Sequence, residues 1–124
     1  MRVLLDTHVF LWWALDDPRL GVSARGAIGA ASEAFVSIVT AWEIAIKRAI
    51  GKLDVLPLSA DLLDSHGFTL VPATLEHAAL SSELPLHHRD PFDRMLIAQA
   101  HYEGLTLVTH DRRLFAYPIP IVRA

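Results

Sequence analysis

Residues 2–15 read Arg-Val-Leu-Leu-Asp-Thr-His-Val-Phe-Leu-Trp-Trp-Ala-Leu, and this stretch decides the class of fold. The run at residues 2–5, apolar after its first residue, predicts a buried strand. The apolar residues at 8–15 predict a helix that begins almost at once, so Asp6 lies at the joint between the two elements. A strand followed directly by a helix is typical of α/β proteins with a parallel sheet.

The same alternation continues along the chain. Several helix starts carry capping residues: Ser23 in a small-residue segment, Thr40 and Glu43 at capping-box spacing, and Asp90 followed by Pro91. Further strands are expected over residues 34–38, 68–71, 105–109 and 119–122, and helices over 23–32, 40–50, 59–66, 74–84 and 90–104, with a helical turn over 111–115. We therefore expect a single α/β domain, 1–124, with a mainly parallel sheet of four to five strands.

The charge and the lack of cysteine exclude several classes of function. The net charge is −3 and the chain contains no cysteine. Disulfides, thiolate nucleophiles and Cys-ligated zinc are therefore ruled out, and a reducing, cytoplasmic location is expected. The apolar stretches are far shorter than the roughly 20 residues that span a bilayer, so no membrane association is expected. An acidic protein is not typical of one that holds nucleic acid by neutralising phosphates, unless a bound cation inverts the charge of an acidic pocket.

Hydrophobic residues make up 52% of the chain, against roughly 45–50% in ordinary soluble domains. This excess predicts that a second copy or another protein covers some of the apolar surface. The adjacent Trp12 and Trp13 favour the same conclusion, because both cannot face inward from one helix. One of them is therefore expected at an interface.

Four acidic residues fall where the predicted strands end or the helices begin: Asp6, Glu43, Asp93 and Asp111. In a parallel sheet the carboxyl ends of the strands and the starts of the following helices share one edge, where such folds bind ligands. The surroundings of these acids are apolar, since Glu43 is the only acid within residues 38–50 and Asp93 begins the apolar stripe of its helix. We therefore expect the four carboxylates to converge on one side of the sheet.

Carboxylates at close range repel one another unless a cation compensates them. A set of oxygen donors suits a hard divalent ion such as Mg²⁺ or Mn²⁺, which lowers the pKa of a bound water and stabilises charge on a phosphoryl oxygen. The seven histidines are scattered, with no HExxH or HxH spacing, so no zinc site is expected. The four acids are therefore candidate catalytic and metal-binding residues.

Each acid also has a structural alternative. Asp6 and Asp111 could cap the elements that follow them, and Asp93 could interact favourably with a helix dipole. Glu43 could complete a capping box or form an i,i+4 pair with Lys47. All these alternatives would have to coincide on one edge of the sheet, which makes a shared function the better hypothesis.

Polar and basic residues near the acids are candidates for supporting roles. Hydroxyls could orient the acids or bond to metal-bound water, and basic side chains could hold phosphates on a rim, although ordinary caps and solvated charges have the same sequence pattern. His8 and His110 flank acids and could touch substrate. The other candidates are the hydroxyls of Thr7, Thr109 and Ser37 and the basic groups of Lys47, Arg94, Arg112 and Arg113.

Four motifs, in this order, resemble those of the PIN domain family, and specifically of VapC-type toxins of bacterial and archaeal toxin–antitoxin pairs. They are Leu4-Leu-Asp6-Thr7-His8-Val-Phe-Leu-Trp12; Ser37-Ile-Val-Thr40-Ala-Trp-Glu43-Ile-Ala-Ile-Lys47 with Gly51-Lys-Leu53; Asp90-Pro-Phe-Asp93-Arg-Met-Leu-Ile-Ala-Gln-Ala100; and Leu107-Val-Thr109-His-Asp111. The resemblance spans nearly the whole chain, and each motif retains its acid.

The resemblance implies a three-layer α/β/α fold and a metal-dependent endoribonuclease that uses Mg²⁺, for which Mn²⁺ can substitute. The metal-binding acids of the family carry over onto Asp6, Glu43, Asp93 and Asp111, with Asp93 preferred to Asp90 because it begins the buried stripe and with Asp111 acting through water. A homodimer and a small VapB-like antitoxin are also implied. The antitoxin would block the site and help to repress the shared operon, so the chain would meet DNA only through its partner.

Two other functions stay open at this point. A receiver-type phospho-acceptor domain also gathers acids at a sheet edge, but it needs an acceptor Asp after the third strand and a Lys after the last, and this sequence has neither. A non-catalytic partner-binding subunit would use the acids to dock an arginine of another protein. Cleavage of RNA by the isolated chain would separate that alternative from a nuclease.

Overall fold

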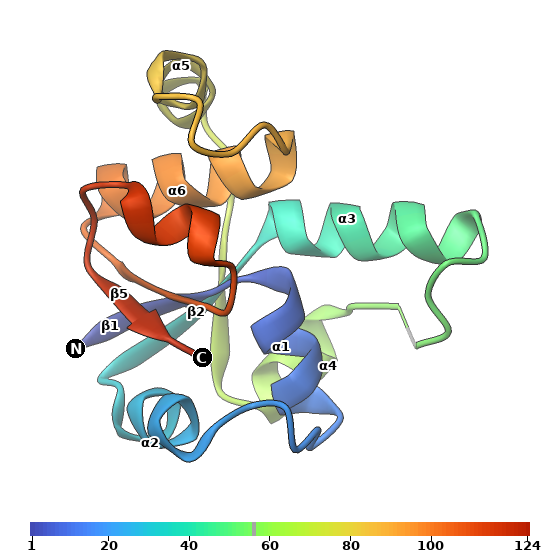
Figure 1. Ribbon diagram of the computed structural model, residues 1–124. Coiled ribbons are helices and arrows are strands. Elements are labelled where there is room, and N and C mark those ends of the chain that lie inside the picture. The colour runs from blue at the N-terminus through green and yellow to red at the C-terminus, as the bar shows by residue number, and fades with distance from the viewer. Residues whose placement is uncertain (56) are drawn as a thin grey trace.

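Five short strands form the sheet within residues 1–55 and 57–124, which are the residues described by the computed structural model. The strands are β1 (Arg2–Leu5), β2 (Glu33–Ser37), β3 (Phe68–Val71), β4 (Thr106–Thr109) and β5 (Ile121–Arg123). Their order is β3-β2-β1-β4-β5, and all four neighbouring pairs are parallel (Figure 1). The α/β fold with a parallel sheet, expected from the sequence, is confirmed.

Helices cover both faces of this sheet (Figure 1). They are α1 (Thr7–Ala14), α2 (Val22–Ala30), α3 (Ile38–Ala49), α4 (Ala60–Ser65), α5 (Leu75–Glu83) and α6 (Pro91–Glu103), with a 3-10 helix η1 (Arg112–Ala116). An apolar cluster joins α1, α2 and α4 to one face, and another joins α6 and η1 to the opposite face, with α5 packed on α6. The three-layer α/β/α arrangement is therefore present. Across the two described ranges, no helix is both long enough and apolar enough to cross a membrane.

The central strands β1 and β4 are buried on both faces, and they fix the position of two acids. A continuous apolar run is the pattern expected where helices cover both sides of a parallel sheet. The chain leaves β1 and β4 at the same edge, where Asp6 and Asp111 follow. The residues of these strands that have no exposed surface are Val3, Leu4, Leu5, Leu107, Val108 and Thr109.

Two predicted helix starts are wrong. No side chain caps α2, whose residues are all described: it begins at Val22, with Gly21 rather than Ser23 at its N-cap. The helix expected from residue 40 begins at Ile38, because the Ser37 hydroxyl accepts a hydrogen bond from Val39 N at 2.9 Å and supplies the cap first. Glu43 consequently lies in the second turn of α3, and the capping box with Thr40 does not form.

The predicted cap of α6 forms. Asp90 accepts hydrogen bonds from Phe92 N at 2.8 Å and Asp93 N at 3.3 Å, and Pro91 occupies the first position of α6. Thr74 caps α5, and Gly104 ends α6 in the left-handed conformation. The strong cap of α6 matters for the site, because it fixes the turn that carries Asp93.

The premise that the two adjacent tryptophans cannot both face inward from one helix is wrong, and the interface inferred from it stays a prediction. Trp12 is 7% exposed, and Trp13 packs, partly buried, against the same apolar cluster. Both fit because the cluster extends around α1, with Phe68 beside the Trp13 ring and His110 beside the Trp12 ring. The exposed tryptophan is Trp42 on α3, which is 61% exposed.

Replacing Gly104 by Ala is expected to lower the free energy of unfolding by about 1 kcal/mol, because its φ of +68° strains any residue with a Cβ atom. Space is not the cause, since no described atom lies within 4 Å of the added Cβ. Urea denaturation measures the change. Gly26→Ala, inside α2 and equally unhindered, is the control and should stabilise the protein instead. Equal effects of the two substitutions would contradict the explanation.

Candidate metal centre

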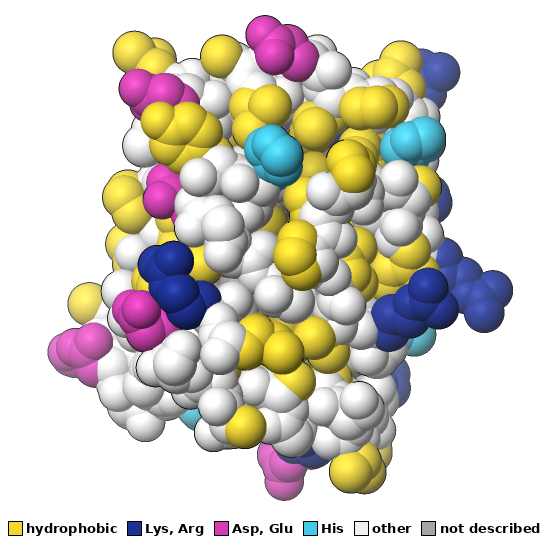
Figure 2. All heavy atoms as spheres, turned by 90° about the vertical axis from the view of Figure 1, so that its left-hand side faces the viewer, with side chains coloured by type: hydrophobic (Ala, Val, Ile, Leu, Met, Phe, Trp, Pro, Cys, Tyr) yellow, Lys and Arg dark blue, Asp and Glu magenta, His cyan; other side chains and the backbone are white. Residues whose placement is uncertain are grey.

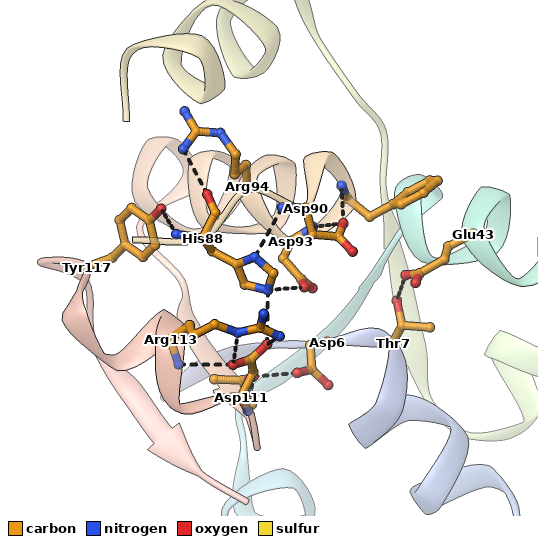
Figure 3. Close-up of polar contacts among 12 residues, drawn as sticks. Asp6, Thr7, Glu43, His88, Asp90, Asp93, Arg94, Asp111, Arg113 and Tyr117 are labelled. Atoms are coloured by element: carbon orange, nitrogen blue, oxygen red, sulfur yellow. Dashed lines mark hydrogen bonds and ion pairs between the residues drawn. The ribbon is translucent and has the colours of Figure 1, made fainter. Parts of the chain in front are cut away.

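The four predicted acids lie in one pocket at the carboxyl edge of the sheet. Its volume is about 640 Å³. Asp6 is the N-cap of α1, Glu43 lies on α3, Asp93 is in the first turn of α6, and Asp111 is the N-cap of η1 (Figure 3). On the opposite side of the molecule, where the strands begin, acidic side chains appear singly (Figure 2). The convergence expected from the sequence is therefore a feature of this edge.

Asp6 is the most deeply held of the four carboxylates. Its Oδ1 accepts a hydrogen bond from Val9 N at 2.8 Å, and its Oδ2 accepts one from the buried hydroxyl of Thr109. Thr109 also accepts a hydrogen bond from Asp111 N at 3.1 Å, so this predicted hydroxyl orients two acids. Burial raises the pKa of Asp6, and the hydrogen bonds from Thr109 and Val9 oppose the rise only in part.

Glu43 is compensated within the chain. Its Oε1 accepts a hydrogen bond from the Thr7 hydroxyl at 2.6 Å, and its Oε2 lies 2.8 Å from Lys47 Nζ. The i,i+4 pair with Lys47, one of the structural alternatives for this acid, is thus present. Glu43 is only 6% exposed, so Thr7 and Lys47 together stabilise a carboxylate that burial would otherwise disfavour.

Asp93 and Asp111 differ in their electrostatic environment. Burial raises the pKa of Asp93 to about 7, and the neighbouring carboxylates of Asp90, Asp6, Glu43 and Asp111 add to the rise. At Asp111, partial burial also raises the pKa, but hydrogen bonds from the side chain and backbone of Arg113 outweigh it and hold the value below the usual range. Negative charge at Asp93 is therefore compensated less than at Asp111.

His88 belongs to this group, and sequence reasoning missed it. Its Nε2 lies 2.9 Å from Asp93 Oδ2 and 3.0 Å from Asp111 Oδ2, and the side chain is 5% exposed. The residue lies in the connection between α5 and α6, outside any predicted element. Its nearness to Asp90 and Asp93 in the sequence is the single available signal, and no metal-binding spacing accompanies it.

Arg94 does not reach the pocket, so its predicted contact with phosphate there is not supported. Its guanidinium points back over the connection between α5 and α6 and donates to four carbonyl oxygens. The acceptors are the carbonyls of Ser81, Leu84, Pro85 and His88. Arg94 therefore holds the chain segment that carries His88.

Of the remaining candidate residues, some line the pocket and others do not. Ser37 is turned into the fold, where its hydroxyl donates to Gln99 Oε1 at 2.5 Å. Arg19, which the sequence analysis did not single out, adds a basic side chain to the wall of the pocket. The predicted residues that line the pocket beside the acids are Thr7, His8, Lys47, His110, Arg112 and Arg113.

The residues present fit a divalent cation. Four carboxylates converge, and the raised pKa of Asp93 shows that the basic groups of the chain leave negative charge uncompensated there. Oxygen donors of this kind suit a hard ion. His88, Asp93 and Asp111 also bring one possible ligand atom each to within 4.8 Å of one another. The fold and this pocket define an α/β protein with a candidate carboxylate site for a metal ion.

Comparison with known proteins places the chain within a family. Residues 3–119 match the model of the PIN domain. The chain is 38% identical to Ribonuclease VapC22 of Mycobacterium tuberculosis, over 95% of this chain and 93% of that protein. The chain belongs to the PIN domain family, and the resemblance to its VapC-type members is confirmed. The receiver-type alternative is thereby set aside.

Solved structures show the same fold. VapBC2 from Rickettsia felis, bound to a DNA fragment from its promoter, superposes with a TM-score of 0.71 at 15% identity, over 99% of this chain and 98% of that one. A toxin–antitoxin complex from Klebsiella pneumoniae gives a TM-score of 0.69 at 20% identity, over 97% of this chain and 95% of that one. At these identities the likeness establishes the fold alone.

Proposed function

We propose that this chain is a metal-dependent endoribonuclease, the VapC-type toxin of a toxin–antitoxin pair. The observation that carries the proposal is the gathering of Asp6, Glu43, Asp93 and Asp111 from four separate elements into one pocket. Similarity to Ribonuclease VapC22 supports the same activity. An acidic protein can act on an acidic polymer in this way because the ion, rather than the carboxylates, meets the phosphate.

The chain's own residues would divide the work at this site. Asp6, Glu43, Asp93 and Asp111 would hold Mg²⁺ or Mn²⁺, which when bound lowers the pKa of a water and stabilises charge on phosphoryl oxygens. Thr109 and Thr7 orient the acids through the hydrogen bonds described above. The basic side chains on the pocket wall, from Arg19, Lys47, Arg112 and Arg113, would hold the flanking phosphates of the RNA strand.

We also propose a VapB-like antitoxin, a homodimer and a cytoplasmic location. The structural relatives described above are toxin–antitoxin assemblies, which supports a protein partner of that kind. Trp42 and Phe92 support a second protein surface, because the largely exposed Trp42 ring packs edge-on against Phe92 with centroids 5.2 Å apart.

RNA cleavage by the purified chain, without its partner, tests the proposed function. A labelled RNA should be cut in the presence of Mg²⁺ or Mn²⁺ and left intact with excess EDTA. Cleavage that persists in EDTA would contradict the metal requirement. A correctly folded chain that binds the metal and the antitoxin but never cuts RNA would favour the non-catalytic partner-binding subunit.

Added Mn²⁺ or Mg²⁺ is expected to raise the melting temperature, because the ion binds the folded state and compensates the carboxylates. At ten times the dissociation constant the stabilisation is about 1.4 kcal/mol by linkage. Differential scanning fluorimetry across a metal titration measures it. The control is buffer without divalent cations, brought to the same ionic strength with NaCl. An equal rise of the melting temperature in NaCl would show that general screening of charge is responsible.

A further inference from the structure

The buried imidazole of His88 lies behind the acidic pocket and joins two of its walls. Nε2 is within 3.0 Å of both Asp93 Oδ2 and Asp111 Oδ2, so one nitrogen bridges a carboxylate from α6 and a carboxylate from η1 (Figure 3). His88 is not one of the described residues that line the pocket, whereas both aspartates are. The imidazole therefore contacts the acids from the protein side.

The other ring nitrogen fixes where the proton of the neutral ring lies. Nδ1 accepts a hydrogen bond from Asp90 N at 3.1 Å, so Nδ1 carries no proton. The proton of the neutral ring is then on Nε2, which donates to Asp111 Oδ2 and lies 2.9 Å from Asp93 Oδ2. A protonated nitrogen has no lone pair for a metal ion. Although His88, Asp93 and Asp111 include the donor types of a mixed metal site, the hydrogen bond to Asp90 N assigns His88 a different role.

The backbone of His88 is held from both sides, which fixes the position of the ring. Its N–H donates to Tyr117 Oη at 3.1 Å, and its carbonyl accepts a hydrogen bond from Arg94 at 3.2 Å. Tyr117 in turn donates to the carbonyl of Pro85 at 2.6 Å. These contacts hold the main chain of His88 in place on an otherwise irregular segment.

We propose that His88 is the positioning residue of the metal site: its Nε2–H holds the Asp93 and Asp111 carboxylates together, facing the pocket, without binding the ion itself. The inference rests on the proposed function, because it needs a metal at these acids. Two adjacent carboxylates repel one another in the absence of the ion, and a neutral N–H donor between them offsets the repulsion without occupying the pocket. Groups that orient metal ligands in this way typically contribute about 10- to 100-fold to metal affinity.

Isothermal titration of the full-length chain with Mn²⁺ tests the proposal. His88→Leu removes the donor and is expected to weaken Mn²⁺ binding by about 10- to 100-fold. His88→Gln keeps an N–H donor of similar reach and should bind Mn²⁺ close to wild type. His101→Gln is the matched control, an exposed histidine at the far end of α6, and should have no effect. Pulsed EPR of the Mn²⁺-loaded wild type should show no coupling to a histidine nitrogen.

Tyr117→Phe provides a second variant if His88→Leu does not fold. It removes the hydroxyl that holds the His88 main chain and keeps the buried ring, so a smaller loss of Mn²⁺ affinity than for His88→Leu is expected. Unchanged Mn²⁺ affinity in Tyr117→Phe, or in a folded His88→Leu, would overturn the positioning role of His88 without contradicting the proposed metal site. Weak binding by His88→Gln together with a histidine-nitrogen coupling in the wild type would make His88 a ligand and also overturn it. A wild type that does not bind Mn²⁺ would overturn the proposed metal site and this role together.

Discussion

Replacing Asp93 by Asn is expected to lower the rate of RNA cleavage by about 1000-fold, comparable to the loss of a group that stabilises charge in the transition state. Burial and the neighbouring carboxylates raise the pKa of Asp93 to about 7, so a bound cation is needed to stabilise its charged form. Asn keeps the size of the side chain but is neutral and a far weaker ligand. Initial rates on a labelled RNA at saturating Mg²⁺ measure the loss.

Asp90→Asn is the matched control for this substitution. Asp90 lies three residues earlier and also lines the pocket, but its Oδ1 accepts two backbone hydrogen bonds as the cap of α6. Asn caps helices as well as Asp does, so the fold should be retained and activity should fall far less than in Asp93→Asn. Comparable losses of cleavage rate in the two variants would show that the total negative charge of the pocket, rather than metal ligation by Asp93, determines the activity.

The positions of Asp90 and Asp93 illustrate how much of the pocket the sequence could predict, although the choice of Asp93 as the ligand stays a prediction. Local sequence patterns were sufficient to place a side chain wherever a helix cap or the periodicity of a helix determines which way it points. Asp90 had the pattern of a cap followed by proline, and Asp93 had the spacing of a buried stripe. The same reasoning placed Asp6 and Asp111 after the two central strands, because uninterrupted apolar runs indicate strands covered on both sides.

The helix that carries Glu43 shows where local signals compete. Two hydroxyl residues, Ser37 and Thr40, could each have begun α3, and their caps have similar strength. The strand before them ends at Ser37, which accepts a hydrogen bond from Val39 N and leaves Thr40 inside the helix, against Thr7. Glu43 lies in the pocket although the turn predicted for it was wrong, because the two possible caps lie within one helical turn of each other and Glu43 is helical with either.

His88 and Arg94 could not be placed from the sequence, because their positions depend on contacts between distant segments. The imidazole meets Asp111 across 23 residues, and its backbone meets Tyr117 across 29. Arg94 was expected to face phosphates because of its neighbours in sequence. On the folded chain, carbonyl oxygens at the end of α5 and in the segment after it lie within reach of Arg94, and such groups need donors when they are shielded from water.

The metal-free chain is expected to lose stability as the pH rises from about 4 to about 7, the reverse of the usual behaviour of an aspartate. The folded-state pKa of Asp93 is raised to about 7, whereas an unfolded aspartate titrates near about 3.9. In this window the folded state retains the proton that the unfolded state has lost, so each increase in pH favours unfolding. Burial raises the pKa of Asp6 as well, and its contribution has the same sign.

The contribution of Asp93 to this effect is about 2 kcal/mol between pH 5 and pH 8. Two pKa units in that range correspond to about 2.7 kcal/mol if fully expressed, and partial contact with solvent reduces the figure. The Asp93 side chain is 22% exposed. Urea denaturation in EDTA at a series of pH values measures the change. The free energy of unfolding of Asp93→Asn should change much less over the same range, so the variant should exceed the wild type by a margin that grows with pH.

Bound metal should reverse this dependence in the wild type. The ion requires deprotonated carboxylates, so its stabilising effect should increase as the pH rises through the pKa of Asp93. At saturating Mn²⁺ the wild type should therefore gain most at pH 8, where the metal-free chain is weakest, and Asp93→Asn should gain little at any pH. A metal-free chain that grows more stable from pH 5 to pH 8 would show that Asp93 is already compensated by the protein, as Glu43 is by Thr7 and Lys47. The need for a cation at this acid, on which the proposed nuclease depends, would then be lost.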